Sequence, residues 1–285
     1  MKIGQLLMEA YNILKSVNID TYMLDSQLLL QKVLEKDKLY IILNRDIEVD
    51  KDKVDKYFSL IGMRKNKMPV KYILGQCEFM GIEFNIKEGV LIPRGDTEVL
   101  VEMAIENIKE NGYTEICDVC CGSGAIGVSV GKILNNTKIC CYDISEIAYD
   151  VTLENINKFN LGKRVEVYKS DLLTQAIQEK RKFDFILSNP PYIKKDVIPT
   201  LMDDVKNYEP YIALCGGENG LDFYVRIVEQ SLKVLKKGGM IGFEIGHDQR
   251  EPVEKILINN GFEKIIWQKD LAGLDRVIMA KLKVK

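Results

Sequence analysis

The strongest constraint on the fold is a series of short apolar runs that alternate with helical patterns from residue 115 onward. The runs cover residues 115–119, 138–142, 164–168, 183–188 and 240–245, followed by a final pair at 264–267 and 277–282. Strands that alternate with helices are typical of parallel sheets covered by helices on both faces. The sequence therefore predicts an α/β fold with a seven-stranded, doubly wound sheet.

The four residues after the run at 183–188 are the most informative part of the chain. The segment Asn189-Pro190-Pro191-Tyr192 follows that predicted strand directly and so lies at its carboxyl end, where open α/β sheets bind ligands. The Asn189 side chain offers a hydrogen-bond acceptor. The two prolines have fixed φ angles and no backbone N–H, which leaves a stiff segment with unpaired carbonyls.

This segment suits a substrate with a planar NH₂ group. Its acceptors would hold both hydrogens and leave the nitrogen lone pair free to attack a methyl donor, while Tyr192 would lie against the plane of the group. We therefore expect Asn189, Pro190, Pro191 and Tyr192 to form the catalytic and substrate-binding site for methylation of an amide or an aromatic amine.

A candidate donor site lies upstream of this segment. The predicted strand at 115–119 contains Asp118 and leads into the turn Cys120, Cys121, Gly122, Ser123 and Gly124. A strand, a glycine-containing turn and a helix let the backbone approach a ligand closely. The next strand ends at Asp143, 19 residues after Gly124. An acidic residue at this spacing can accept hydrogen bonds from both ribose hydroxyls of an adenosine.

The third strand is followed by Asp171 and Leu172, which add a polar group at the same edge. Two kinds of ligand fit these features, a dinucleotide and S-adenosylmethionine. Residues 122–127 match the dinucleotide pattern Gly-x-Gly-x-x-Gly, so this pattern does not exclude the first. Asp118 and the segment at 189–192 have no role in hydride transfer, and they favour S-adenosylmethionine.

Residues 115–192 resemble class I S-adenosylmethionine-dependent methyltransferases of the Asn-Pro-Pro-Tyr type, which methylate adenine N6 in DNA or glutamine amides in proteins. Other segments resemble the peptide chain release factor glutamine methyltransferases, the HemK/PrmC family. These segments are residues 91–98, 208–210, 213–214, 216–221, 243–246, Gln249 and 270–276. The resemblance thus extends over almost the whole chain and is most specific from 90 to 276.

The resemblance implies a Rossmann-like domain with an antiparallel last strand. It also implies methylation of the N5 amide nitrogen of the Gly-Gly-Gln glutamine in class 1 release factors, with S-adenosylmethionine as donor, which modulates translation termination. The implied donor-binding residues are Asp118, Cys120, Cys121, Gly122, Ser123, Gly124, Asp143, Asp171, Leu172 and Asn189. Arg94 joins residues 189–192 as an implied substrate-binding residue.

The chain departs from the family pattern at three positions. The family usually has Gly at the position of Cys120, often Thr at Cys121, and Pro at Gly95. A side chain at position 120 would crowd the methionine part of the donor, so we expect altered affinity but retained binding. Gly95 makes its loop costlier to order than proline would.

Residues 1–75 have a different character. Apolar residues recur at helical spacing around residues 6–17, 24–34 and 54–63, which predicts a small helical bundle. The resemblance implies that this bundle recognises the protein substrate. Residues 76–92 alternate around Gly81 and Gly89, which predicts a β-hairpin between the bundle and a methyltransferase domain at 93–285.

Composition agrees with a soluble globular protein. Of the 285 residues, 46% are hydrophobic, and the formal net charge is −2. No apolar stretch is long enough to span a membrane and no signal peptide is evident, so we expect a cytoplasmic, monomeric protein without a direct nucleic-acid partner. The seven cysteines are an odd number, and most of them lie in predicted strands, where they are expected to pack as small apolar residues and not to bind zinc.

Three alternatives to release factor methylation remain open. The first is a glutamine methyltransferase that acts on a ribosomal protein. The second is an N6-adenine DNA methyltransferase, for which the chain lacks an evident basic groove. The third is a non-catalytic adenosine-binding protein, which the intact segment at 189–192 argues against.

Overall fold

The computed structural model describes residues 1–284, and the chain divides into two compact units. One unit consists of Met1–Gln76 and Met202–Tyr208, and the other consists of Cys77–Leu201 and the chain from Glu209 onward. No helix among the described residues is both long enough and apolar enough to cross a bilayer.

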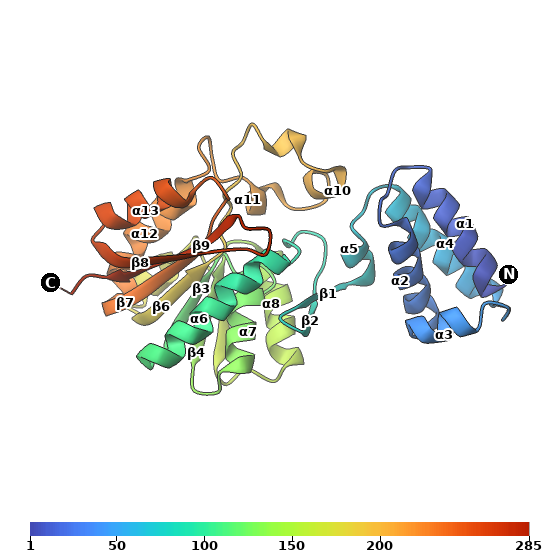
Figure 1. Cartoon of the computed structure of the whole chain (residues 1–285). Helices are drawn as coiled ribbons and strands as arrows, with labels where there is room; N and C mark the ends of the chain where they lie inside the picture. Colours follow the sequence, from blue (N-terminus) through green and yellow to red (C-terminus); the bar gives the residue numbers. More distant parts are fainter. Residues whose placement is uncertain (285) are drawn as a thin grey trace. The chain divides into compact units, whose positions relative to one another are not determined.

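The first unit is a bundle of short helices, as the spacing of its apolar residues predicts (Figure 1). Its helices are α1 (Ile3–Lys15), α2 (Tyr22–Leu34), α3 (Lys38–Leu43), α4 (Lys51–Lys65), α5 (Val70–Leu74) and α10 (Asp203–Lys206). Leu6, Leu29 and Ile61 bring the apolar faces of α1, α2 and α4 into one core. The apolar spacing does not predict α3 and α5, because both are too short to show a helical period.

A buried ion pair holds part of this bundle together. The Arg64 guanidinium donates to the Asp25 carboxylate across 2.7 Å, and both side chains are less than a tenth exposed. Asp204 lies 4.0 Å from the same guanidinium, and the Tyr208 hydroxyl donates to the Asn66 carbonyl oxygen. These contacts explain why residues 202–208 belong to the helical unit, although the sequence analysis assigns them to the methyltransferase domain.

The second unit begins with a β-hairpin of β1 (Gln76–Phe79) and β2 (Ile82–Asn85). Two residues join the strands, Met80 and Gly81, and both have positive φ angles. A two-residue hairpin turn of this type requires such angles because they match the twist of the strands. The predicted hairpin is confirmed.

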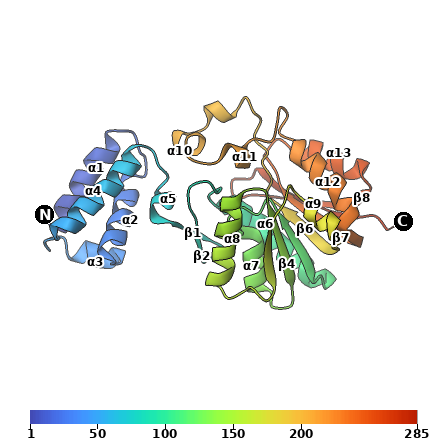
Figure 2. The same cartoon turned by 180° about the vertical axis from the view of Figure 1, so that it is seen from behind.

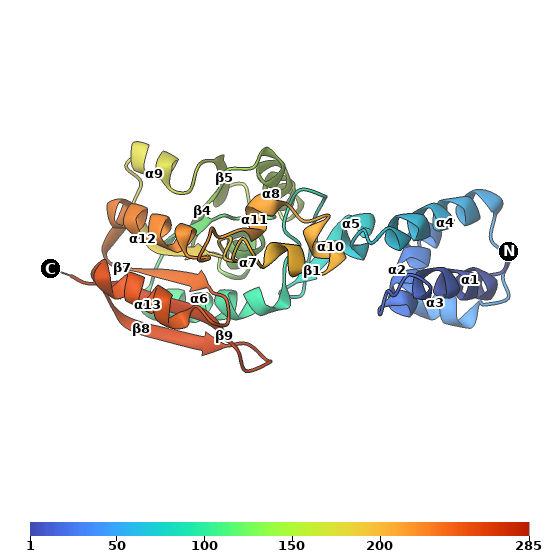
Figure 3. The ribbon, with the colours of Figure 1, turned by 90° about the horizontal axis from the view of Figure 1, so that it is seen from above.

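A seven-stranded sheet forms the centre of the second unit, in the order β5-β4-β3-β6-β7-β9-β8. The first five strands of this order are parallel, whereas β9 is antiparallel to both of its neighbours, β7 and β8, beside which Figure 3 shows it. The strands are β3 (Glu115–Val119), β4 (Lys138–Asp143), β5 (Val165–Lys169), β6 (Phe183–Ser188), β7 (Leu235–Glu244), β8 (Phe262–Lys269) and β9 (Asp275–Leu282). This order confirms the predicted fold class.

Helices cover both faces of the sheet (Figures 1 and 2). One face packs against α6 (Glu98–Asn111), α7 (Ala125–Ile133) and α8 (Glu146–Lys158), and the other against α9 (Thr174–Gln178), α12 (Asp222–Val234) and α13 (Arg250–Asn259). The short helices η1 (Gly95–Thr97), η2 (Ile198–Thr200) and α11 (Tyr211–Leu214) lie in the connecting loops.

The cysteines of the sheet show how its strands divide the two cores. Cys141 belongs to the core beneath α6, α7 and α8, whereas Cys117 and Cys140 belong to the core beneath α9, α12 and α13. Successive side chains of a strand point to opposite faces. These cysteines are therefore buried in two separate layers, and the sulfur of Cys140 also accepts a hydrogen bond of 2.8 Å from the Arg181 guanidinium.

The start of β7 differs from the prediction. The apolar run predicts a strand from residue 240, but Leu235 already pairs with Phe183 as the first residue of β7. The predicted start at residue 240 is wrong, because Gly238 and Gly239 lie within the strand. Gly238 has a φ of +70°, and a Cβ atom at Gly239 would lie 2.9 Å from the Asp184 carbonyl oxygen.

Candidate active site

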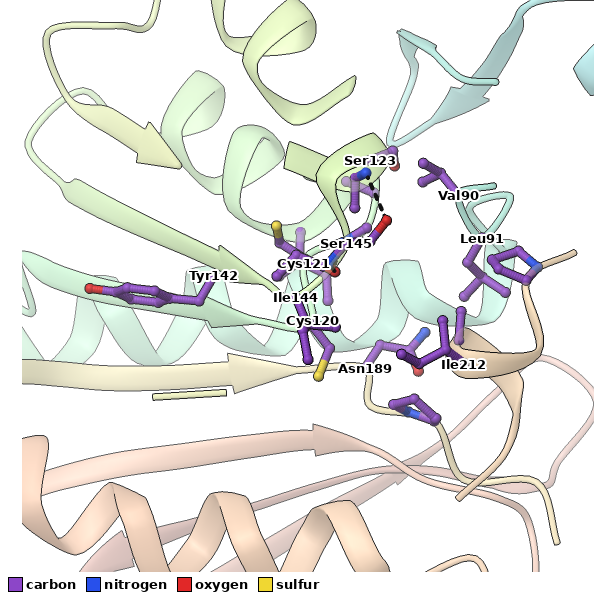
Figure 4. A pocket seen from close by; sticks show the side chains of 18 of the residues that line it. Val90, Leu91, Cys120, Cys121, Ser123, Tyr142, Ile144, Ser145, Asn189 and Ile212 are labelled. Carbon is purple, nitrogen blue, oxygen red and sulfur yellow. Dashed lines mark hydrogen bonds between the residues drawn. The ribbon is translucent and has the colours of Figure 1, made fainter. Parts of the chain in front are cut away.

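A cavity of about 260 Å³ lies at the carboxyl ends of β3, β4, β5 and β6, where parallel strands bring their last residues to one edge (Figure 4). Most of the predicted site residues line it: Arg94, Cys120, Cys121, Gly122, Ser123, Asp143, Asp171, Leu172, Asn189 and Pro191. Four predicted residues do not line it: Asp118, Gly124, Pro190 and Tyr192.

The turn after β3 needs left-handed backbone at alternate positions. Cys120, Gly122 and Gly124 have φ angles of 60°, 58° and 77°. A Cβ atom at Gly124 would lie 2.9 Å from the Thr152 methyl group, so this position requires glycine. Cys120 is the exception to the glycine rule, because an L-residue with positive φ is strained by about 1–2 kcal/mol.

Asp118 lies behind this turn and is fully buried. One of its carboxylate oxygens, Oδ2, accepts a hydrogen bond of 2.8 Å from the Gly127 backbone N–H, in the first turn of α7. Burial raises the pKa of Asp118 to about 7, and the Gly127 hydrogen bond opposes this rise. The contact orients the start of α7, so the carboxylate acts on the turn and does not face the cavity.

Asp143 has the geometry expected of a ribose-binding residue. Its two carboxylate oxygens accept hydrogen bonds of 2.9 Å from the backbone N–H groups of Gly122 and Ser145. Burial raises its pKa, and both of these bonds oppose the rise. Each carboxylate oxygen has a second lone pair for a further donor. The carboxylate is thus fixed at the cavity wall with acceptor capacity for a vicinal diol.

The edge after β5 includes a charged pair that the sequence analysis does not predict. The Arg226 guanidinium, on α12, donates to the Asp171 carboxylate across 2.7 Å. Both residues line the cavity together with Leu172 and Phe223. Because Arg226 lies 55 positions from Asp171 in the sequence, only the fold brings these two side chains together.

Asn189 is held by a residue from another part of the chain. Its amide nitrogen Nδ2 donates to the Thr97 hydroxyl oxygen across 3.2 Å. The Thr97 hydroxyl in turn donates to Glu244 Oε2 across 2.5 Å. Since the nitrogen of the amide is used in this way, the amide oxygen remains as its acceptor for a ligand.

Tyr192 does not contribute a flat face to the cavity. Its hydroxyl donates to Glu244 Oε1 across 3.0 Å, beneath the segment at 189–192. Glu244 is 1% exposed, and burial raises the pKa of its carboxyl despite hydrogen bonds from Thr97 and Tyr192 that lower it. Glu244 gives a sequence signal, since an acidic residue inside an apolar strand requires polar partners.

Gln249 and two glycines, Gly216 and Gly220, contact the backbone of the same segment closely. The Gln249 side-chain amide donates to the carbonyl oxygens of Tyr192 and Gly220, at 3.0 and 3.1 Å. A Cβ atom at Gly220 would lie 2.4 Å from the Tyr192 carbonyl oxygen, and one at Gly216 would lie 2.7 Å from its Cα atom. The close approach of the two loops therefore depends on glycine.

Arg94 lines the cavity and pairs with a buried acid. Its guanidinium donates to the carboxylate of Glu209, whose side chain is 1% exposed. Pro210, Ile212 and Ala213 follow Glu209 and line the cavity as well, and Figure 4 shows Ile212 among the lining side chains. The segments that resemble one family, at 91–98, 208–210 and 213–214, thus contribute Arg94, Pro210 and Ala213 to one cavity.

Two protein-family models match this sequence, one in the helical bundle and one in the part that contains the sheet. Residues 5–75 match the model of the PrmC N-terminal domain, and residues 95–204 match that of the methyltransferase small domain. Among solved structures, the T. thermophilus 16S rRNA N2 G1207 methyltransferase in complex with AdoMet and guanosine has a TM-score of 0.52 at 15% identity. That match covers 73% of this chain and 50% of that chain, and it shows a shared fold.

Two relatives match over nearly the full length. The release factor glutamine methyltransferase of Clostridium botulinum is 59% identical over 281 residues, which cover 99% of each chain. The release factor glutamine methyltransferase of Clostridium acetobutylicum is 51% identical over 280 residues, which cover 98% of each chain. Identity at this level extends through both units, and we conclude that the chain belongs to the release factor glutamine methyltransferase family.

Proposed function

We propose that this chain methylates the side-chain amide nitrogen, N5, of the Gly-Gly-Gln glutamine in class 1 peptide chain release factors, with S-adenosylmethionine as the methyl donor. The observation that carries the proposal is the geometry of Asn189, whose amide nitrogen is bound to Thr97 while the residue lines the cavity beside the turn at 120–124. An acceptor is thereby available where a substrate NH₂ group would enter.

The residues of the cavity fit the proposed donor. Asp143 offers carboxylate lone pairs for the ribose hydroxyls, and the backbone of residues 120–124 can approach the amino-acid end closely. We assign adenine binding to Asp171 and Leu172, which line the cavity together with Arg226 and Phe223. When bound, S-adenosylmethionine would supply a methyl group on a good leaving group, a sulfonium.

The chemistry requires orientation more than a strong base. The lone pair of an amide nitrogen is delocalised into its carbonyl, which makes this nitrogen a poor nucleophile. If the Asn189 side-chain oxygen and the Pro190 carbonyl accept the two amide hydrogens, the nitrogen is held in line with the methyl group. The same two acceptors would stabilise the positive charge that develops on nitrogen in the transition state. The transfer would leave S-adenosylhomocysteine as the leaving group, and the nitrogen would release one of its two protons to water.

We assign the other parts of the chain by the same reasoning. Residues 1–75 would recognise the release factor, residues 76–92 would link the bundle to the catalytic domain, and residues 93–285 would bind donor and glutamine. Arg94 would contact the substrate at the rim of the cavity, in the orientation that Glu209 gives it. The enzyme would act as a monomer in the cytoplasm, where release factors work.

The test is transfer of a tritiated methyl group from S-adenosylmethionine to a purified class 1 release factor. A release factor in which the Gly-Gly-Gln glutamine is replaced, a ribosomal protein fraction and duplex DNA serve as parallel acceptors. Label on the intact release factor alone would support the proposal. Label on the altered factor, on ribosomal protein or on DNA would contradict the proposed acceptor.

A further inference from the structure

We infer that Thr97 and Glu244 are positioning residues that determine which end of the Asn189 side-chain amide faces the substrate. The inference rests on the proposed function and adds to it a reason why the amide presents oxygen and not nitrogen. The three residues come from separate elements: Thr97 ends η1, Asn189 follows β6, and Glu244 ends β7.

The chain of contacts is continuous and buried. Asn189 Nδ2 lies 3.2 Å from Thr97 Oγ1, which lies 2.5 Å from Glu244 Oε2. Thr97 is 4% exposed and Glu244 is 1% exposed. Because water has little access to these two residues, the direction of each hydrogen bond depends on the protons that the protein groups carry.

A count of protons gives that direction. A carboxylate accepts hydrogen bonds and donates none. In its carboxylate form, which the hydrogen bonds from Thr97 and Tyr192 and the charge of Arg276 favour against burial, Glu244 takes the single hydroxyl proton of Thr97 at Oε2 and that of Tyr192 at Oε1. The Thr97 oxygen is then left with lone pairs alone for Asn189, so only the NH₂ end of the amide can face it. The amide oxygen must point the other way.

Reversal of the hydrogen bonds from Glu244 through Thr97 to Asn189 would disable the site. If position 244 donated a proton to Thr97, the Thr97 hydroxyl proton would be free to bind the Asn189 oxygen, and the amide could rotate by half a turn. Its NH₂ group would then face the NH₂ group of the substrate glutamine, donor against donor. The charged groups that act on Glu244 are Arg276, which favours the carboxylate, and Asp96, which opposes it.

The first experiment compares Thr97→Val with Thr97→Ser. Valine keeps the shape of threonine and removes the hydroxyl, so kcat for release factor methylation should fall about tenfold, which corresponds to about 1.4 kcal/mol. Thr97→Ser should restore most of the lost turnover. The KM for release factor and the calorimetric Kd for S-adenosylmethionine should change less than about twofold in either variant, because neither substitution removes a proposed contact with release factor or with the donor.

Thr137→Val is the matched control, since Thr137 is also buried, donates its hydroxyl proton to a backbone carbonyl and does not line the cavity. A similar loss of turnover in Thr137→Val would show a general effect of buried threonine and would overturn the inference. So would unchanged turnover in a folded Thr97→Val, or equal losses in the valine and serine variants.

A second variant tests the direction of the hydrogen bonds between Glu244, Thr97 and Asn189. The amide of Glu244→Gln can donate to Thr97, so this variant should lose turnover to the same extent as Thr97→Val. The double variant should be no worse than either single variant, because the two residues act through one contact to Asn189. Additive losses would overturn the inference.

A readout that does not depend on activity separates this inference from the proposed function. In protein labelled with ¹⁵N-asparagine, the side-chain amide signal of Asn189 is identified by its loss in Asn189→Ala. This signal should shift, and its hydrogens should exchange faster, in Thr97→Val but not in Thr137→Val. An unchanged signal would overturn the inference, whereas absence of methyl transfer by the unaltered enzyme would overturn the proposed function and leave this result standing.

Discussion

The Tyr192 hydroxyl donates to the buried Glu244 carboxylate across 3.0 Å. Tyr192 does not line the cavity, so it stabilises the segment at 189–192 through Glu244. This arrangement differs from a stacking role against the substrate. It places the aromatic ring among apolar neighbours of the core and its polar atom on the carboxylate that also binds Thr97.

Tyr192→Phe should therefore act through Glu244 and not through substrate contact. The loss of one buried hydrogen bond should reduce the free energy of unfolding by about 1–3 kcal/mol. The KM for release factor should stay within about twofold of the original value, because a hydroxyl that faces Glu244 makes no contact in the cavity. Chemical denaturation and steady-state kinetics measure the two effects, and an increase in KM with unchanged stability would favour the stacking role.

Asn189→Ala should lower kcat by about 10² or more, the scale on which one preorganised transition-state hydrogen bond contributes. Donor binding should be largely kept. The assay is methyl transfer at saturating donor, with calorimetry of S-adenosylmethionine binding beside it. Asn260→Ala, at the end of α13 and outside the cavity lining, is the control, and full activity of Asn189→Ala would rule out the proposed role.

Asp143→Ala should weaken donor binding by about 1.5–3 kcal/mol, the range for hydrogen bonds to a charged group. The variant also removes the acceptor for the Gly122 and Ser145 backbone N–H groups, so the turn loses part of its support. Calorimetry with S-adenosylmethionine and with its demethylated product measures the change. Asp150→Ala removes an exposed acid of α8 and should leave the Kd unaltered, while an unchanged Kd in Asp143→Ala would refute ribose binding.

Asp118→Asn should change how stability depends on pH. Burial raises the pKa of Asp118 to about 7, so the folded chain holds this proton more tightly than the unfolded chain does. The resulting stabilisation is complete below the ordinary Asp pKa of about 3.9 and is lost as the pH rises to about 7. Relative to Asp118→Asn, the unaltered protein should thus lose stability as the pH rises from about 4 to about 7.

Thermal melts of both proteins across that range of pH test this expectation. Asp143 and Glu244 also have raised pKa values, but both variants retain them, so their contributions cancel in the difference. Parallel curves for the two proteins would mean that folding does not raise the pKa of Asp118.

The sequence alone determined the fold class and the edge of the sheet at which the site lies. Apolar runs and helical patterns are local, and strands β3 and β6 begin and end where the sequence analysis expects. Parallel strands bring their carboxyl ends together whatever the loops contain, so the turn at 120–124, Asp143 and Asn189 were expected to lie close together. Residues 120–123, Asp143 and Asn189 line one cavity.

Only the tertiary structure decided which side chains act on one another inside that site. Thr97 lies 92 positions from Asn189 and 147 from Glu244, and Arg226 lies 55 from Asp171. A hydrogen bond requires atoms within about 3 Å and in suitable directions, and spacing along the chain does not specify either quantity for residues on different elements. For the same reason, the sequence could suggest Tyr192 as a binding face, while the fold turned its hydroxyl toward Glu244.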